Sequence, residues 1–374
     1  MLSRQKHSQP SVSANMPLPP QSLPRLPTFL LLVLAATCLP ACRTSPPLGS
    51  ISKRQGDEIV VAGEFVHTGA RVVLWMDPGG YDAYRVERRF SPLAKSDWEN
   101  SQVEAKDLSS PNRYNLRRNG LSETEIEQVR GGGWDLPTLQ GVVDQLVLHF
   151  DACGTSRQCF NVLQDHRGLS VHFMIDLDGT VYQTLDVKER AWHATSSNSR
   201  SVGVEIANIG AYDANARNPL GDWYVKDTHG STRINLPQRF GDGGIRTKKF
   251  IGHPSRPDPV YGKIQARELV QYDFTTEQYR ALAHLTAALC RVLPQIRCDC
   301  PRDKSGQPLL HKLPEEELKG YQGVLGHYHI QSDKVDPGPA FRWDDLIVNA
   351  RRLLHSGMSE QADETSRGHL RPRN

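Results

Sequence analysis

Three short apolar segments in the middle of the chain restrict its fold more than any other feature. They span residues 144–150, 171–176 and 201–206, and polar or turn-forming residues separate them. Apolar runs of this length are typical of buried strands. The Asp178-Gly179 pair then predicts a hairpin turn that leads into a partner strand over 180–185. The middle of the chain is therefore expected to contain a sheet of buried strands.

Helix signals lie on both sides of these strands. Ser122 and Glu125 have the spacing of a capping box, which predicts a helix over 122–129. Thr275 is the expected N-cap of a longer helix whose leucines share one face. Further helices are expected over 159–165 and 343–354.

The composition of the chain changes at several points, which predicts a division into parts. The expected parts are a signal peptide over 1–41, a tether over 42–60, an accessory segment over 61–135, a main domain over 140–355 and a disordered tail over 356–374. Runs typical of β-structure at 58–61 and 71–75 indicate that the accessory segment is β-rich. The stretch 209–270 is too long for a normal loop, so we expect it to be an insertion in the main domain.

The N-terminal region has the anatomy of a targeting signal. Residues 26–41 contain no charged residue, Arg25 precedes them and Cys42 follows them. Sixteen residues suit the apolar region of a signal peptide better than a membrane-spanning helix. The small residue before Cys42 resembles a bacterial lipobox, which implies lipidation of this cysteine, whereas an ordinary cleaved secretion signal is the alternative. The lipobox implies an envelope protein with a lipid anchor. Arg43 is not acidic, which favours the outer membrane, facing the periplasm, by resemblance to lipoprotein sorting in enteric bacteria.

The charge balance limits the classes of partner. The chain has 45 Lys and Arg against 42 Asp and Glu, and residues 1–41 hold three of these basic residues and no acid. The remainder is formally neutral, which argues against a nucleic-acid-binding protein. With 38% hydrophobic residues, the chain is also too apolar to be disordered as a whole. The sequence does not indicate an oligomeric state.

Cysteine usage agrees with export. Five cysteines follow Cys42, at positions 153, 159, 290, 298 and 300, so at most two bridges form and one thiol is left over. Cys298 and Cys300 are too close in sequence for an easy mutual bridge. Either of them is therefore a candidate partner of Cys290.

Residues that suit metal-assisted hydrolysis stand at the ends of the expected strands. His149 ends one apolar run, Glu205 lies inside another, and His327 and Asp336 belong to one Gly- and Pro-containing loop. Two imidazoles and one carboxylate are the ligand count of a catalytic zinc site with an open position. A nearby carboxylate that is not a ligand, such as that of Glu205, can accept a proton, and the ammonium of Lys334 can neutralise an oxyanion. From spacing alone, scattered structural residues are the competing interpretation.

The order of these motifs resembles that of a known family. The matching segments are 146–150, 169–176, 191–194, 201–208, 326–327 and 334–341. In this order they are similar to the type 2 N-acetylmuramoyl-L-alanine amidases, zinc enzymes that share a fold with the peptidoglycan recognition proteins. The resemblance covers about 145–345 without the insertion. It implies an α/β (α+β) fold with a central mixed β-sheet flanked by helices, preceded here by the β-rich accessory segment.

The resemblance also assigns roles to individual residues. It implies that the ligands of Zn²⁺ are His149, His327 and Asp336, that Glu205 is the general base or orients the water, and that Lys334 steadies the oxyanion. It places His193 and Asn208 near the substrate. His172 lies in the middle of an expected strand, and a structural or cleft-wall histidine is favoured there over a metal ligand. The resemblance also implies a disulfide between Cys153 and Cys159.

The chain departs from the family pattern at three points. Asp151 is a second acid close to the expected metal, the stretch between His327 and Asp336 is about one residue short, and the insertion follows the Glu205 strand directly. The shortened stretch puts the position of Lys334 in doubt.

The resemblance implies hydrolysis of the amide between N-acetylmuramic acid and L-alanine, with peptidoglycan or muropeptides as substrate. A non-catalytic peptidoglycan-binding module is the alternative, and a zinc peptidase that cuts elsewhere in the stem peptide is a weaker one. Binding modules of this family typically lose a metal ligand, whereas the full set is present here. This favours the enzyme.

Overall fold

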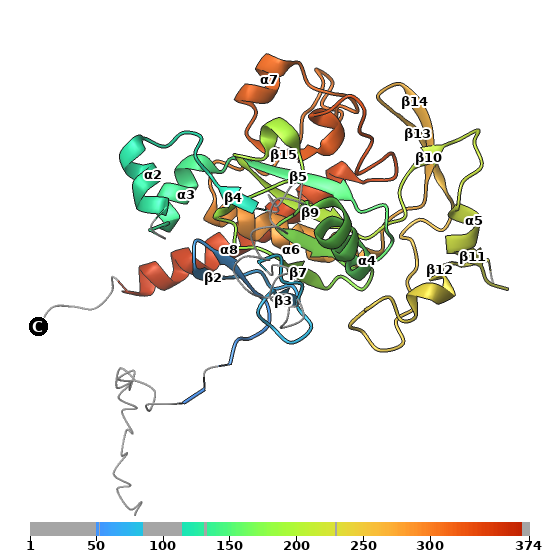
Figure 1. The fold of residues 1–374 in the computed structure, drawn as a ribbon, viewed down its shortest axis with the longest axis horizontal. Helices are drawn as coiled ribbons and strands as arrows, with labels where there is room; N and C mark the ends of the chain where they lie inside the picture. The colour runs from blue at the N-terminus through green and yellow to red at the C-terminus, as the bar shows by residue number, and fades with distance from the viewer. Residues whose placement is uncertain (1–49, 52, 85–113, 131–132, 229, 369–374) are drawn as a thin grey trace, which may run out of the picture. The chain divides into compact units, whose positions relative to one another are not determined.

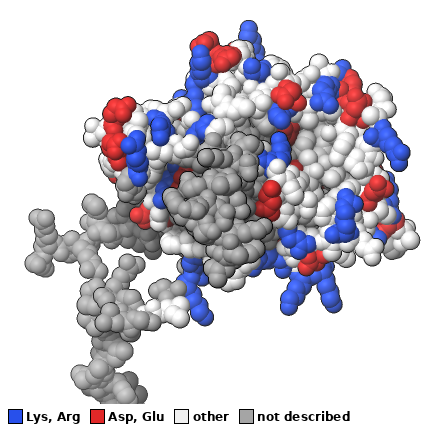
Figure 2. All heavy atoms as spheres, in the orientation of Figure 1, with Lys and Arg blue, Asp and Glu red and all other residues white. Residues whose placement is uncertain are grey.

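A computed structural model describes residues 50–368, apart from 52, 85–113, 131–132 and 229, with side chains up to residue 356. The expected signal peptide and Cys42 lie outside the described residues. Within them, no helix is long and apolar enough to cross a membrane. Lys and Arg are interspersed with Asp and Glu on the face shown in Figure 2 and do not gather into one patch.

Six strands form the central sheet, in the order β15-β5-β9-β6-β7-β3 (Figure 1). Their bounds are Gly323–Gly326 for β15, Gln145–Phe150 for β5, Ser201–Ile206 for β9, Phe173–Ile175 for β6, Val181–Gln183 for β7 and Val72–Leu74 for β3. The β6-β7 hairpin is antiparallel, and the other neighbouring strands are parallel. The mixed sheet and the hairpin at Asp178-Gly179 are confirmed.

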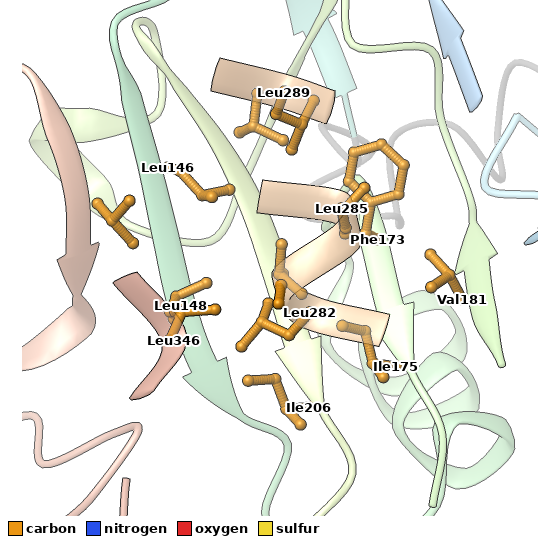
Figure 3. Close-up of a cluster of buried hydrophobic side chains, with 14 of the residues drawn as sticks. Leu146, Leu148, Phe173, Ile175, Val181, Ile206, Leu282, Leu285, Leu289 and Leu346 are labelled. Atoms are coloured by element: carbon orange, nitrogen blue, oxygen red, sulfur yellow. The ribbon is translucent and has the colours of Figure 1, made fainter. Parts of the chain in front are cut away.

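Two helices cover one face of this sheet. They are α6 (Thr276–Val292) and α8 (Trp343–Gly368), which pack against each other. Leu282, Leu285 and Leu289 of α6 point at the apolar side chains of the sheet (Figure 3). All three are at most 1% exposed, and burying each contributes about 2 kcal/mol. Thr275 and Gln278 form the capping box that fixes the start of α6.

The opposite face is covered by α4 (Ser156–Asn161) and a π-helical turn, η3 (Val162–Arg167). Phe160 and Leu163 from these helices pack with Met174 and Tyr182 from the sheet. The helix expected over 159–165 is therefore present but begins three residues earlier, because Thr155 caps it. The first turn of α4 consequently lies close to the end of β5.

The accessory segment is part of the main body. Its strand β3 is wholly buried and pairs with β7 as the edge of the central sheet. Further elements lie in or next to this segment. They are the hairpin of β1 (Glu58–Val61) and β2 (Glu64–His67), the strand β4 (Tyr114–Leu116), which pairs with β8 (Glu189–Ala191), and the helices α2 (Glu123–Arg130) and α3 (Leu136–Val142). Strand β1 begins inside the expected tether because Ile59 and Val61 are buried in the core.

The insertion has a small hydrophobic core of its own. Its elements are β10 (Tyr212–Asp213), α5 (Leu220–Trp223), β11 (Tyr224–Lys226), β12 (Thr232–Ile234), η5 (Gln238–Phe240), β13 (Val260–Ile264) and β14 (Arg267–Gln271). Trp223 also packs on Gly154, where the β-carbon of any larger residue would lie 2.4 Å from the indole ring. The insertion is thus attached to the loop that follows β5.

The remaining elements are the short helices η4 (Thr195–Ser197), α7 (Glu315–Gly320) and η6 (His327–His329). The last helix, expected over 343–354, extends to Gly368, so residues 356–368 are helical where a disordered tail was expected. This stretch contains no proline, and glycine at its end is a common helix terminator.

Asp176 follows β6 and makes the stability of the fold depend on pH. Its side chain is fully buried, and burial raises its pKa to about 7. The folded protein therefore favours the protonated form of Asp176. The contribution of this group to the free energy of unfolding is complete below about pH 4 and is lost as the pH rises to about 7. Asp176→Asn cannot ionise. We expect it to raise the free energy of unfolding at pH 8 by roughly 2–4 kcal/mol, with little change at pH 4.

Urea unfolding at the two pH values measures this difference. Asp178→Asn is the control, because hydrogen bonds from Thr247 and Thr180 outweigh burial and lower the pKa of Asp178. That substitution is expected to destabilise the protein at pH 8. A uniform effect of Asp176→Asn at both pH values would show that the carboxyl group does not titrate as argued.

Candidate active site and metal centre

Three parallel strands bring the candidate residues to one edge of the sheet. His149 near the end of β5 is in register with Glu205 near the end of β9. Residues in register on neighbouring strands point to the same face. Strand β15 runs parallel to β5 on its other side and ends at Gly326, immediately before His327. In open α/β sheets this carboxyl edge is where ligands bind.

His149, His327 and Asp336 converge on one point and are buried. Nδ1 of His149 lies 3.1 Å from Nδ1 of His327 and 2.8 Å from Oδ2 of Asp336, and the third side of the triangle is 3.0 Å. Ligand atoms around a tetrahedral zinc ion are separated by roughly 3.4 Å. The three atoms are therefore placed to hold a small cation after a slight widening.

The ionisation states of these groups suit metal binding. Burial and the neighbouring His327 lower the pKa of His149 to about 4, so its imidazole is neutral at pH 7. Burial alone would raise the pKa of Asp336, but the two imidazoles beside it hold that pKa below its ordinary value. A neutral imidazole and an ionised carboxylate are the forms that bind a metal.

The Nε2 atoms of the two candidate ligands His149 and His327, which face away from the cluster, also have partners. Nε2 of His327 lies 2.7 Å from Oε1 of Gln331, and Nε2 of His149 lies 3.0 Å from Nδ1 of His193. An acceptor at Nε2 leaves Nδ1 unprotonated and free for a metal. Gln331 was not among the residues predicted from the sequence. The available signal was its position four residues after a ligand, in the same loop.

Glu205 adds a second carboxylate beside this cluster. Among the described residues, its Oε2 is buried and has no hydrogen-bond partner. Burial, followed by the charges of Asp336 and Asp151, raises the pKa of Glu205 well above its ordinary value. A buried carboxylate that neighbouring acids oppose is unfavourable without a cation beside it. The residues present therefore fit a divalent metal.

A cleft of about 610 Å³ opens over these residues. Glu205 and the three candidate ligands line it, and so does Lys334, whose ammonium lies 3.8 Å from the carboxylate of Asp333. Arg167, Arg190 and Trp192 line another part of the wall, with the Arg190 guanidinium 4.5 Å from the centre of the Trp192 ring. The indole Nε1 of Trp192 is buried without a partner among the described residues. The cleft can therefore offer the cations of Lys334, Arg167 and Arg190 to a polar substrate.

Of the three residues predicted near the substrate or in the cleft wall, His193 lines the cleft, whereas His172 and Asn208 do not. His193 lines the cleft and contacts His149, as described above. His172 is fully buried behind His193, accepts a hydrogen bond from the Gly203 backbone and contacts the Glu189 carbonyl, so it is structural. Asn208, expected near the substrate, is not among the residues that line the cleft: its amide nitrogen donates to the Tyr272 carbonyl and its amide oxygen accepts from the Gly210 backbone.

Asp151 organises the loop that follows β5. Its Oδ1 accepts hydrogen bonds from the backbone N–H groups of Cys153, Gly154 and Asn208. Cys153 and Cys159 both line the cleft as free thiols in contact with each other. The predicted disulfide is therefore not formed in this structure, although the two residues are adjacent.

Comparison with known proteins identifies the family. The model of the family described as N-acetylmuramoyl-L-alanine amidase matches residues 139–339, more than half of the 374-residue chain. No curated protein matches the chain. A solved structure of a selenomethionine derivative of AmpD aligns with a TM-score of 0.32 and 16% identity, over 64% of this chain and 91% of that one.

Two further solved structures are similar. AmiD from E. coli, in complex with its substrate anhydro-N-acetylmuramic acid-L-Ala-D-gamma-Glu-L-Lys, aligns with a TM-score of 0.31 and 17% identity, over 55% of this chain and 57% of that one. The amidase endolysin LysCS from Clostridium intestinale URNW aligns with a TM-score of 0.30 and 13% identity, over 57% of this chain and 86% of that one.

Proposed function

The chain belongs to the N-acetylmuramoyl-L-alanine amidase family and hydrolyses the amide between N-acetylmuramic acid and L-alanine, and we propose that it does so with a zinc ion held by His149, His327 and Asp336. The observation that supports this most strongly is the convergence of two imidazole nitrogens and one carboxylate oxygen next to the unpartnered carboxylate of Glu205. Two nitrogens and one oxygen suit zinc, and three protein ligands leave a position open for catalysis.

A zinc ion held by these residues would supply Lewis acidity, which would make a water molecule more acidic and polarise the carbonyl of the scissile amide. Glu205 lines the cleft together with the ligands, and its buried Oε2 has no hydrogen-bond partner among the described residues. It accepts the proton of the attacking water and delivers it to the nitrogen of L-alanine as the amide bond breaks. Glu205 is thus the general base and then the general acid.

Lys334 has an electrostatic role in this scheme. As the water oxygen adds to the carbonyl carbon, negative charge collects on the carbonyl oxygen. The Lys334 ammonium belongs to the cleft wall and is about one-third exposed, so it can move toward that oxygen. His193 holds Nε2 of His149 and forms the neighbouring wall.

Muropeptides or peptidoglycan are the proposed substrates, and cleavage of a defined muropeptide tests this. The expected products, detected by mass spectrometry, are the sugar with a free lactyl carboxylate and a stem peptide with a free L-alanine amino terminus. Release of a shortened peptide instead would indicate a peptidase that cuts within the stem.

We also propose that the protein is exported and lipid-anchored through Cys42, at the outer membrane, with a Cys153–Cys159 disulfide. The apolar, uncharged 26–41 segment and the adjacency of the two thiols support this. In a Gram-negative host, Cys42→Ala is expected to move the protein from the membrane fraction to the soluble fraction. Peptide mapping of the same wild-type preparation without reductant is expected to recover the cross-linked peptide.

Ser45→Ala, three residues beyond Cys42, is the control and should leave the protein with the membranes. If Cys42→Ala fractionates like the wild type, the anchor is not a lipid on this cysteine. If alkylation labels Cys153 and Cys159 quantitatively, the disulfide is absent.

A further inference from the structure

A buried arginine connects the accessory segment to the active site. Arg117 directly follows β4, whose pairing with β8 places it against the segment that carries Trp192 and His193. Its side chain is 0% exposed, although arginine is almost never fully buried unless it is paired. The residue lies outside the region 139–339 that matches the family. Its environment therefore requires an explanation specific to this chain.

The guanidinium of Arg117 is satisfied by backbone carbonyls. Nε donates to Val187 at 3.1 Å, Nη1 to Asn198 and Ser199 at 3.3 and 3.1 Å, and Nη2 to Ser201 at 2.8 Å. These carbonyls lie at the two ends of the segment 187–201. One side chain thus ties both ends of this segment together, and charge-assisted hydrogen bonds are about twice as strong as neutral ones.

The same segment ends hold His193 in place. Oδ1 of Asn198 accepts hydrogen bonds from the backbone N–H groups of His193 and Ala194, at 3.0 and 2.7 Å. Oγ of Ser201 lies 3.2 Å from Nε2 of His193. Asn198 and Ser201 are the residues whose carbonyls Arg117 binds, so Arg117 fixes the two groups that orient the His193 backbone and ring.

Close packing behind His193 leaves its ring little freedom. A β-carbon at position 203 would lie 2.7 Å from the ring, so Gly203 permits this approach. His172 stands edge-on to His193 with ring centres 6.0 Å apart, and its Nε2 lies 3.1 Å from Nη2 of Arg117. Arg117 therefore supports the back of the ring as well as its two hydrogen-bonded ends.

His193 in turn meets the proposed metal ligand His149. When Nδ1 of His149 is used for the metal, Nε2 carries the proton and donates it to Nδ1 of His193 at 3.0 Å. Nε2 of His193 then carries a proton and donates it to Oγ of Ser201. This chain of hydrogen bonds sets the tautomer and the orientation of His149.

We propose that Arg117 is a positioning residue of the metal centre, which acts through Asn198, Ser201 and His193 on the ligand His149. The inference rests on the proposed zinc site. It gives the accessory segment a role in the reaction, because the residue that directly follows β4 lies outside the matched family region. Loss of the guanidinium is expected to loosen His149 and weaken zinc binding.

The test compares zinc affinity in Arg117→Met and Arg118→Met by competition with a chromophoric chelator. Arg118 is the matched control, because it is the same residue type one position later and is exposed. Arg117→Met is expected to bind zinc 10- to 100-fold more weakly than the wild type, the range for the loss of a group that orients a ligand. Arg118→Met should bind zinc as the wild type does.

Two more measurements separate positioning from a general loss of stability. The increase in Tm that saturating zinc produces should shrink in Arg117→Met, whereas a purely structural role would lower the Tm of the zinc-free and zinc-bound forms equally. Ser201→Ala keeps the carbonyl that Arg117 binds but removes the hydroxyl that His193 contacts. It should therefore weaken zinc binding several-fold even if Arg117→Met does not fold.

The outcomes distinguish this inference from the proposed function. Wild-type zinc affinity in folded Arg117→Met or in Ser201→Ala would overturn the positioning role and leave the zinc amidase intact. A wild-type protein that binds no zinc would overturn both.

Discussion

Glu205→Gln is expected to lower kcat on a muropeptide by about 10³-fold while zinc stays bound. The substitution keeps the size of the side chain and removes its ability to accept a proton. Because Glu205 is not one of the three ligands, zinc affinity should not fall. Steady-state kinetics and metal analysis of the same preparation measure both quantities.

Glu268→Gln is the control for the chemical change itself. Glu268 is an exposed acid in the insertion, paired with Lys263, and it does not line the cleft. Its replacement should leave kcat within about twofold of the wild type, since surface changes away from special features have small effects. Turnover by Glu205→Gln at the wild-type rate would show that another group accepts the proton.

His327→Ala is expected to abolish tight zinc binding and to reduce activity by more than 10³-fold. It removes one of three ligands and leaves the buried carboxylate of Asp336 facing a single imidazole. Zinc affinity should therefore fall by more than 100-fold, which is more than the loss expected for a residue that only orients a ligand. Metal content after gel filtration, measured together with activity, provides the comparison.

His329→Ala is the matched control, two residues further along the same loop. His329 accepts a hydrogen bond from the Gly326 backbone, and its Nε2 lies 2.8 Å from the Leu309 carbonyl, so both nitrogens point away from the ligands. This variant should be less stable but keep its zinc. A variant pair with the opposite behaviour would mean that the ligand set is wrong.

The strands that carry His149 and Glu205 could be predicted because each is a short apolar run. Their register could not, because both strands are buried almost throughout and show no alternation of buried and exposed residues. The parallel pairing of β5 with β9 makes His149 and Glu205 neighbours. His327 and Asp336 lie far away in sequence, so the ligand count suggested a link to His149 but left scattered structural residues as an alternative, and the family resemblance decided between the two. The sheet explains that connection, because β15 is added next to β5.

Other parts depend on contacts that have no local signal. Arg117 lies in a polar stretch, and its burial becomes visible only when β4 pairs with β8. Strand β3 resembles any short β-run, and its place at the edge of the central sheet depends on its parallel pairing with β7. Asn208 belongs to a matching motif, but its side chain donates to the backbone of Tyr272, just beyond the insertion, a contact that motif matching does not detect.

The most direct test of the central claim is digestion of a defined muropeptide by the purified protein before and after removal of metal with a chelator, with mass spectrometry of the products. We predict cleavage between N-acetylmuramic acid and L-alanine, loss of that cleavage after chelation and recovery when one equivalent of zinc is added. Undiminished cleavage at this bond by metal-free protein would contradict the account.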